Sequence, residues 1–166
     1  MVVFAEYVVI RSFMSRKPDE FDRSILRALQ KNAGLSQREL ADIVGLSQNA
    51  CWRRLNALRA SGLVGNQTLR LDPARLGLGL TVFVMVRTRN HSREWLERFH
   101  KAVTAIPNVI DFYRIAGDYD YMLKIITQDM ESFDTIYRTL ISRVDLDTVT
   151  SYMAMEAISA NRDLPV

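Results

Sequence analysis

Between residues 48 and 56, the sequence contains side chains that can read DNA bases. Asn and Gln can each form two hydrogen bonds with adenine, and Arg can form two with guanine, in the major groove. In a helix over 48–60, Cys51, Leu55 and Leu58 mark the inward side. The outer side, richest near the helix start, then carries Gln48, Asn49, Trp52, Arg53 and Asn56. These residue types predict a DNA-recognition helix.

Two predicted helix caps place this segment directly after another short helix. Ser36 and Glu39 have the spacing of a capping box, in which each side chain bonds the other residue's backbone amide. The helix that begins there is expected to end near Val44, because Gly45 favours the left-handed turn that closes helices. Ser47 then caps the next helix. Two short helices joined by a glycine turn are typical of a helix-turn-helix.

A further helix and a short hairpin are expected on either side of this pair. Residues 20–31 repeat apolar side chains at helical spacing, and Asp19 can cap their first turn. Two short runs at 63–64 and 68–71 are long enough for a hairpin and too short for an independent sheet. We therefore expect a winged helix-turn-helix domain over 18–72.

Positive charge gathers in the same part of the chain. Residues 16–75 hold eleven Lys/Arg against six Asp/Glu, whereas residues 76–166 hold ten against twelve. This asymmetry indicates that the front part meets a polyanion such as DNA. Phosphate contacts, which add affinity without sequence preference, are expected at both helix starts and at four arginines. These residues are Ser36, Ser47, Arg38, Arg54, Arg59 and Arg70.

A solvated helix surface is the alternative, since many exposed helices carry arginine and glutamine. The coincidence of two caps, a following wing and local positive charge favours DNA binding. Trp52 has two open interpretations, contact with DNA and packing against the wing. Cys51 is expected to be a small core residue. With one cysteine and two histidines in the chain, we expect no disulfide, no metal site and no cofactor.

The second half of the chain changes its apolar pattern after Asp72-Pro73 and two nearby glycines. Strands are expected over 80–88, 109–117, 119–127 and 148–158, and helices over 92–106 and 130–144. This βαββαβ order predicts a ferredoxin-like domain, in which two helices cover one face of a four-stranded antiparallel sheet. The fold class is therefore α+β. The expected parts are an extension at 1–17, the winged domain at 18–72, a hinge at 73–79, the ferredoxin-like domain at 80–160 and a tail at 161–166.

The strand at 80–88 is apolar on both of its faces. Val82, Val84 and Val86 lie on one side, and Phe83 and Met85 lie on the other. Because two helices can bury only one face, we expect the other to pack on a second copy of the chain, sheet against sheet. The alternative is that this strand is apolar by chance.

Five motifs resemble the Lrp/AsnC (leucine-responsive, feast/famine) transcriptional regulators. They are FDRSILRALQKN, LSQRELADIVGLS, CWRRLNALRASGLV, RIAGDYDYMLKI and YMAMEAI, and the resemblance covers residues 19–159. It implies a DNA-binding regulator whose second domain forms dimers, assembles into tetramers or octamers and binds a small effector, usually an amino acid. The GLGLTVFVMV, HSREW and FYRIAGDYDY segments look most like a branch associated with cysteine sensing.

The resemblance also implies an effector site near the loop that joins the second and third strands. Gly117 allows close backbone approach, and Asp118 or Asp120 can accept hydrogen bonds from an ammonium group. Gly117-Asp118 alone can equally be a hairpin turn, and the two roles are compatible. The last strand ends in Ala157-Ile158-Ser159, where many relatives have a charged residue. The implied effector residues are Arg114, Ala116, Gly117, Asp118, Tyr119, Asp120, Tyr121, Thr150, Ser151 and Met153.

An enzyme and a ligand-sensing oligomer without DNA activity are the competing functions. His91 and His100 have no nucleophile or carboxylate spaced to them in a catalytic motif, so we expect a regulator and not an enzyme. The apolar opening segment contains Glu6 and Arg11 and is too short to span a bilayer. We expect a cytoplasmic protein in which residues 1–17 are a disordered appendage and Met14 is an alternative start.

Overall fold

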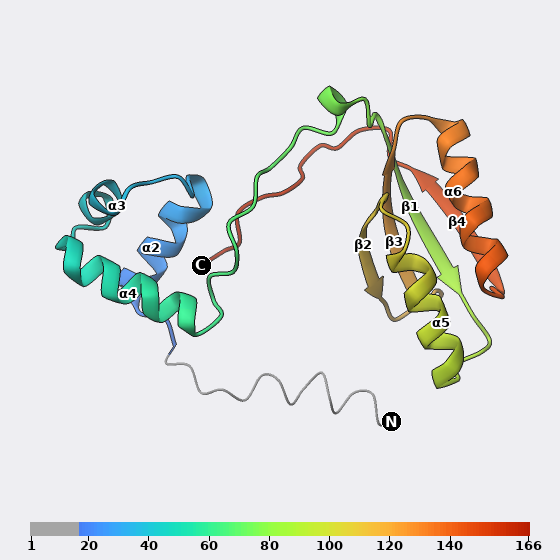
Figure 1. Cartoon of the computed structure of the whole chain (residues 1–166), viewed down its shortest axis with the longest axis horizontal. Helices are drawn as coiled ribbons and strands as arrows, with labels where there is room; N and C mark the ends of the chain where they lie inside the picture. Colours follow the sequence, from blue (N-terminus) through green and yellow to red (C-terminus); the bar gives the residue numbers. More distant parts are fainter. Residues whose placement is uncertain (1–16) are drawn as a thin grey trace. The chain divides into compact units, whose positions relative to one another are not determined.

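The computed structural model describes residues 17–166 and contains two compact units (Figure 1). Of the described residues, the first unit comprises 17–69 together with Ser159–Val166, and the second comprises Arg70–Ile158. The structure thus counts the tail segment with the first unit. The prediction of an extension at 1–17 falls, except for Lys17, outside the described residues.

Three helices with local caps build the first unit. They are α2 (Glu20–Lys31), α3 (Gln37–Val44) and α4 (Gln48–Ala60), as the sequence pattern predicted. Asp19 caps α2, and Ser36 with Glu39 forms the predicted capping box of α3. Gly45 has a φ of 68°, a left-handed conformation that costs glycine little, and it lets α4 follow α3 at once.

The apolar sides of the three helices meet in one core. Ile25 of α2, Leu40 of α3 and Leu55 of α4 are buried there, together with Cys51 and Leu58 of α4. Burying one large apolar side chain stabilises the fold by about 1.5–3 kcal/mol. The inner side of α4 is thereby anchored, which fixes the outer side that the sequence marked for DNA.

The hairpin predicted after α4 does not form. Residues 63–71 contain no strand, and Leu69 is 88% exposed. Two strands of two and four residues with no third strand beside them bury too little to offset the cost of ordering them. The segment instead packs Val64 against the core of the helices, and Nε2 of Gln67 donates a 3.0 Å hydrogen bond to the carbonyl oxygen of Ala33.

A four-stranded antiparallel sheet with two helices builds the second unit, in the predicted βαββαβ order. The sheet order is β2-β3-β1-β4. The strands are β1 (Leu80–Arg87), β2 (Val109–Arg114), β3 (Tyr121–Thr127) and β4 (Thr148–Met153). The helices are α5 (Arg93–Thr104), α6 (Met130–Arg143) and a short 3-10 turn, η1 (Ala74–Leu76).

All four strands are shorter than the sequence pattern predicted, β4 and β2 by the most residues. β4 ends at Met153 and not at Ile158, because Met153 pairs with Val82 and β1 starts only two residues before Val82. Beyond the Ala154 amide, which still donates to Thr81, β1 has almost no residues left to pair. β2 ends at Arg114, so the loop to β3 is longer than a two-residue hairpin turn.

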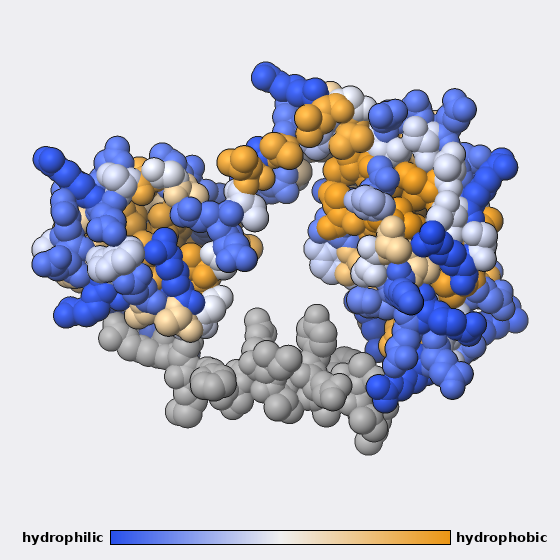
Figure 2. Space-filling view, in the orientation of Figure 1, coloured by the Kyte–Doolittle hydropathy of each residue, from blue (hydrophilic) through white to orange (hydrophobic). Residues whose placement is uncertain are grey.

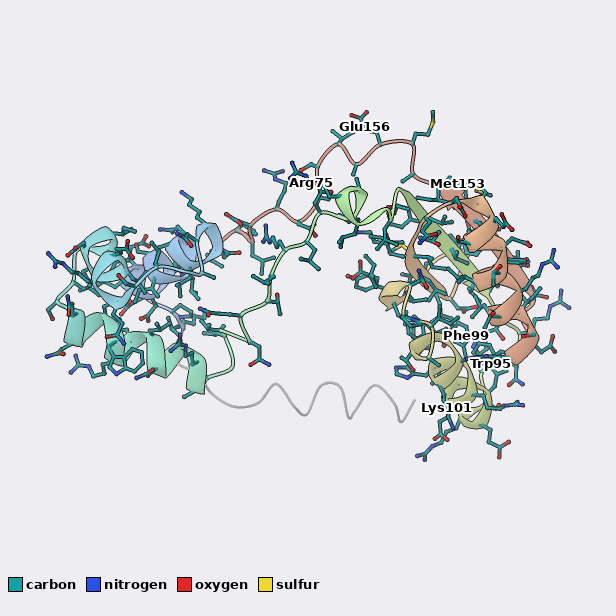
Figure 3. All side chains as sticks on the ribbon, turned by 45° about the horizontal axis from the view of Figure 1, so that its top comes forward. Arg75, Trp95, Phe99, Lys101, Met153 and Glu156 are labelled. Carbon is teal, nitrogen blue, oxygen red and sulfur yellow. The ribbon has the colours of Figure 1, made fainter. Side chains whose placement is uncertain are left out.

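One face of this sheet carries the core under both helices. Val82, Val84 and Val86 of β1 are buried there with Trp95 and Phe99 of α5, whose stacked rings have centroids 4.9 Å apart (Figure 3). Nε1 of Trp95 donates a 2.9 Å hydrogen bond to the carbonyl oxygen of Asp145, so the buried indole has a polar partner. The predicted division of β1 into two faces is confirmed on this side.

The opposite face of the sheet has no helix over it within the second unit. Strand alternation places Phe83 and Met85 of β1 beside Met122 and Ile126 of β3 on this face, and all four are only partly buried. Figure 2 shows apolar residues gathered over the strands of this unit. Lys124 lies among them, with Nζ 3.9 Å from Oδ2 of Asp111 on β2. We refer to this surface as the open sheet face.

Candidate nucleic-acid interface and effector site

The outer side of α4 carries the predicted base-reading residues together. Gln48, Asn49, Arg53 and Asn56 are all exposed. On the inner side, Cys51, Leu55 and Leu58 are at most 5% exposed. The arrangement that the DNA hypothesis required is present, because the polar side of α4 faces solvent and the apolar side holds the helix in place.

Both predicted serines act as helix caps. Oγ of Ser47 accepts a 3.3 Å hydrogen bond from the Ala50 amide at the start of α4. At α3, Oγ of Ser36 accepts from the Glu39 amide, and Oε2 of Glu39 accepts from the Ser36 amide at 2.8 Å. These bonds from Ser36 hold the pKa of the Glu39 carboxyl below its usual range. A phosphate at the start of α3 must therefore compete with Glu39 for the Ser36 amide.

Trp52 and Arg59 form a surface pair on α4. The ring of Trp52 is 41% exposed, and Cζ of Arg59 lies 5.8 Å from the ring centroid. This distance suits a cation–π contact, which holds the guanidinium close to the helix. The alternative in which Trp52 packs against a hairpin loses its basis, because no hairpin forms.

Arg54 binds residues at the start of α2, unlike the exposed Arg53. Its Nη1 lies 2.8 Å from Oδ2 of Asp19 and 2.8 Å from Oδ1 of Asp22, and its Cζ lies 5.4 Å from the Phe21 ring centroid. The hydrogen bonds with Asp19 and then Asp22 raise the pKa of this guanidinium. The expected phosphate contact is therefore replaced by a bond to α2. The sequence spacing could have predicted this orientation, since Arg54 is three residues after Cys51 and four before Leu58, both of which face the core.

The two remaining predicted arginines lie off α4. Arg38 is exposed on α3, with Nε 4.0 Å from Oδ2 of Asp42 in the next turn. Arg70 is exposed and is the first residue of the second unit, so the structure does not group it with the α4 residues.

Asp120 fixes the base of the predicted effector loop. Its Oδ2 accepts a 2.8 Å hydrogen bond from the amide of Thr88, and its own amide donates to the carbonyl oxygen of Val86 at 2.9 Å. Asp120 is thus bonded to the chain beyond β1, whereas Asp118 is exposed. Gly117 has a φ of 134°, a backbone conformation that residues with a side chain rarely adopt. A Cβ atom at this position would have no neighbour within 4 Å, so the backbone conformation and not crowding favours glycine here. Of the two carboxylates, Asp118 is the one available to a ligand.

Tyr119 connects this loop to β4. Its phenol oxygen lies 3.0 Å from Oγ1 of Thr150, so the predicted loop and strand residues do meet. A hydrogen bond with Tyr119 also raises the pKa of the Tyr152 phenol. Sequence reasoning missed Tyr152, although it lies two residues from Thr150 and so shares its side of the strand. Tyr119, Thr150 and Tyr152 form what we call the tyrosine cluster.

The other predicted effector residues do not converge on the tyrosine cluster. Tyr121 points into the core, where its ring centroid lies 4.9 Å from that of Phe99 and burial raises the pKa of its phenol. Ser151 and Met153 pair with Val84 and Val82, on the side of the sheet opposite Thr150 (Met153 is labelled in Figure 3). Arg114 and Ala116 are exposed at the end of β2 and in the loop.

Two family models match consecutive parts of this chain. The Lrp/AsnC ligand binding domain matches residues 81–164, and a winged helix-turn-helix DNA-binding domain matches residues 18–64. The chain belongs to the Lrp/AsnC family of transcriptional regulators. The expected family, the α+β fold class and the DNA-binding regulatory function are thereby confirmed.

Relatives along nearly the whole chain are named as regulators. The glutamate uptake regulatory protein of Zymomonas mobilis is 44% identical over 153 residues, 92% of this chain and 93% of that protein. The DNA-binding transcriptional activator DecR of Escherichia coli is 42% identical over 149 residues, 89% of this chain and 98% of that protein. These names describe regulators and not enzymes.

Two solved structures of family members share the fold. An AsnC family transcriptional regulator from Agrobacterium tumefaciens has a TM-score of 0.85 at 40% identity, covering 89% of this chain and 96% of that one. A transcriptional regulator from Neisseria meningitidis in complex with L-methionine has a TM-score of 0.84 at 32% identity, with the same coverage of both chains.

Residues 17–166 contain neither a metal-binding cluster nor a membrane-spanning helix. No group of three or more His, Cys, Asp or Glu side chains in this part of the chain could hold a metal ion. None of its helices is long and apolar enough to cross a membrane.

Cys51 is buried, and burial raises the pKa of its thiol, which keeps the thiol protonated at neutral pH.

Proposed function

We propose that this Lrp/AsnC regulator places α4 in the major groove and reads base edges with Gln48, Asn49, Arg53 and Asn56. One observation carries the proposal: α4 exposes these four side chains while its opposite side is buried against α2 and α3. Amide and guanidinium groups near a helix start are suited to paired hydrogen bonds with bases.

Backbone contacts surround this reading surface in the proposal. Arg59, held beside Trp52, and Arg38 on α3 supply charge for phosphates. The helix starts at Ser36 and Ser47 supply amides. Arg54 is left out of the interface, because Asp19 and Asp22 already bind it.

We propose a dimer through the open sheet face. Phe83, Met85, Met122 and Ile126 form an apolar surface on a sheet whose other face already carries both helices. A second copy supplies a matching apolar sheet and places two α4 helices at half-sites about one DNA turn apart. Assembly of dimers into tetramers or octamers, as the family resemblance implies, belongs to the same proposal.

We propose an amino acid as the effector, bound at the loop between β2 and β3. The related Neisseria meningitidis regulator was solved with L-methionine. In this chain, the exposed Asp118 carboxylate can accept hydrogen bonds from an ammonium group, beside the backbone of Gly117. Cysteine and methionine are the first candidates.

A DNA-binding experiment with a matched charge control tests the function. Duplexes enriched from a random pool with the wild-type protein provide the operator, and fluorescence anisotropy measures its affinity. We expect Arg53→Ala to weaken operator binding roughly tenfold or more and to relax base preference at one position of each half-site.

The control is Arg23→Ala on α2, which removes the same charge from an exposed residue that pairs with Glu20 of its own helix. We expect Arg23→Ala to bind the operator as wild type does at equal salt. Equal affinity and preference in all three proteins contradict reading by α4.

A thermal-shift screen of the twenty amino acids tests the effector. A ligand that binds only the folded state raises the melting temperature with its concentration. We expect cysteine or methionine to raise it, and a flat response to every amino acid contradicts this part of the proposal.

A further inference from the structure

The segment Ser159–Val166, counted with the first unit, lies against α2. One side chain binds it at two points: Nε2 of Gln30 donates to the carbonyl oxygen of Leu164 at 3.1 Å, and Oε1 of Gln30 accepts from the Leu164 amide at 2.7 Å. One turn earlier on α2, Nε of Arg27 donates to the carbonyl oxygen of Val166 at 2.7 Å. Figure 1 shows this end of the chain beside the helices of the first unit. We call this segment the strap.

The contact fixes the backbone of the strap and leaves its side chains outside. A primary amide that both donates to and accepts from one residue sets the direction of that residue's backbone, as a neighbouring strand does. Leu164 is nevertheless 71% exposed. All three bonds lie at the surface, where water competes for the same groups, so the strap can open without disturbing the core.

Arg27 is prepared for its part of the contact. Its Nη1 lies 2.8 Å from Oε1 of Glu20, one of the acidic residues in the first turn of α2. This pair leaves Nε of Arg27 to meet Val166, which lies 139 residues away in the sequence. The pair with Glu20 therefore helps to orient the Nε donor of Arg27 towards Val166.

The strap gives the chain a second connection between its two units. The first connection is the Leu69–Arg70 junction, and the second is the Ile158–Ser159 junction, five residues after β4 ends at Met153. Loss of the bonds to Gln30 and Arg27 therefore weakens this second connection.

We propose that the strap is a reversible latch that ties the end of β4 to α2 and so limits independent movement of the DNA-binding unit. β4 carries Thr150, which contacts Tyr119 of the effector loop, and the strap follows β4 in the sequence. A structural change at β4 can thus affect α2 through the strap, without passing through residues 73–79. The latch itself depends on neither DNA nor effector, so it can be tested apart from the proposed function.

Hydrogen exchange of the full-length protein tests whether the latch forms. The variants are Gln30→Ala, which removes both bonds to Leu164, and Gln30→Glu, which keeps only the acceptor. Alanine favours helix, so α2 remains intact. We expect the Leu164 amide to exchange at least about fivefold faster in Gln30→Ala than in wild type, with Gln30→Glu in between. Arg23→Ala removes only the 3.9 Å pair with Glu20 and keeps the 2.8 Å pair of Arg27 with Glu20, so it is expected to exchange as wild type does.

Trypsin cleavage after Arg75 tests whether the latch restrains the units. Arg75 lies in η1, five residues after the Leu69–Arg70 junction, and its side chain is 89% exposed. We expect Gln30→Ala to be cleaved there several times faster than wild type and Arg23→Ala, because the remaining connection moves more freely. A Leu164 amide that exchanges in wild type at the rate of an unstructured peptide overturns the latch. Equal cleavage after Arg75 in wild type and Gln30→Ala overturns the restraint.

Discussion

Nη1 of Arg54 lies 2.8 Å from Oδ1 of Asp22, so a residue of α4, the proposed recognition helix, is bound to α2. The side chains are 26% and 11% exposed, which partly shields the pair from water. The contact sets the position of α4 on α2, while Arg53, the next residue, faces solvent. Two adjacent arginines on one helix thus have different roles, because consecutive residues point about 100° apart.

Arg54→Ala is expected to lower the free energy of unfolding by about 1–3 kcal/mol, because it removes the hydrogen bonds of Arg54 to Asp19 and to the buried Asp22. Arg53→Ala is the matched control and is expected to change it by less than about 0.5 kcal/mol. Urea unfolding followed by circular dichroism measures both. Arg54→Lys, which keeps the charge but loses the planar fork, should fall between them. Equal stability of the two alanine variants contradicts a positioning role.

The capping box of α3 predicts a pH effect. Bonds from Ser36 lower the pKa of Glu39 in the folded state below its ordinary value of 4.5. A lowered pKa means that the contribution of Glu39 to stability is present above about pH 4.5 and is lost as pH falls through the folded pKa. The melting temperature of Glu39→Gln should therefore lie below that of wild type at pH 7, and the difference should shrink toward pH 3. A difference that is constant over this range contradicts the assignment.

The helices of the first unit could be predicted closely because their signals are local. The Ser36–Glu39 pair, Gly45 and Ser47 each act within four residues, and α2, α3 and α4 have the predicted bounds. The hairpin prediction failed for the opposite reason. Turn residues permit a hairpin at 63–71, but only a neighbouring strand or helix makes it stable, and a sequence pattern does not show that neighbour.

The open sheet face predicts a dimer that one charge can break. Phe83→Glu places a carboxylate in the apolar surface opposite Lys124, and burial of that charged pair between two sheets is costly. Size-exclusion chromatography with light scattering should show a smaller assembly for Phe83→Glu than for wild type. Ile141→Glu on α6, where Ile141 is 44% exposed, is the control and should keep the wild-type mass. A monomeric wild-type protein, or equal masses for all three, contradicts sheet-to-sheet pairing.

Substitution of the two loop carboxylates should distinguish a loss of stability from a loss of ligand binding. Asp120→Ala removes the acceptor for the Thr88 amide and is expected to cost about 1–2 kcal/mol of stability. Asp118→Ala is expected to leave stability nearly unchanged and to reduce the thermal shift caused by the bound amino acid. Unfolding without ligand and the shift with cysteine or methionine measure the two effects. The assignment fails if Asp118→Ala responds to ligand as wild type does.

The effector site was harder to predict than the helices because it combines distant segments. The sequence showed the Gly117–Asp120 loop and the strand of Thr150, but only the fold shows that Tyr119 meets Thr150 across 31 residues. Strand alternation then separates the set, since Thr150 and Ser151 point to opposite sides. Tyr121 was assigned to the loop by its position in the motif, whereas the register with Val86 sends its ring into the core.

Cys51 gives this protein a built-in reporter. It is the chain's only cysteine, and its 2% exposure places the sulfur between the helices of the first unit. A thiol reagent can reach it only when those helices separate, so the rate of modification measures how often the DNA-binding unit opens transiently. Because operator DNA favours the closed arrangement of these helices, it should lower the rate of Cys51 modification.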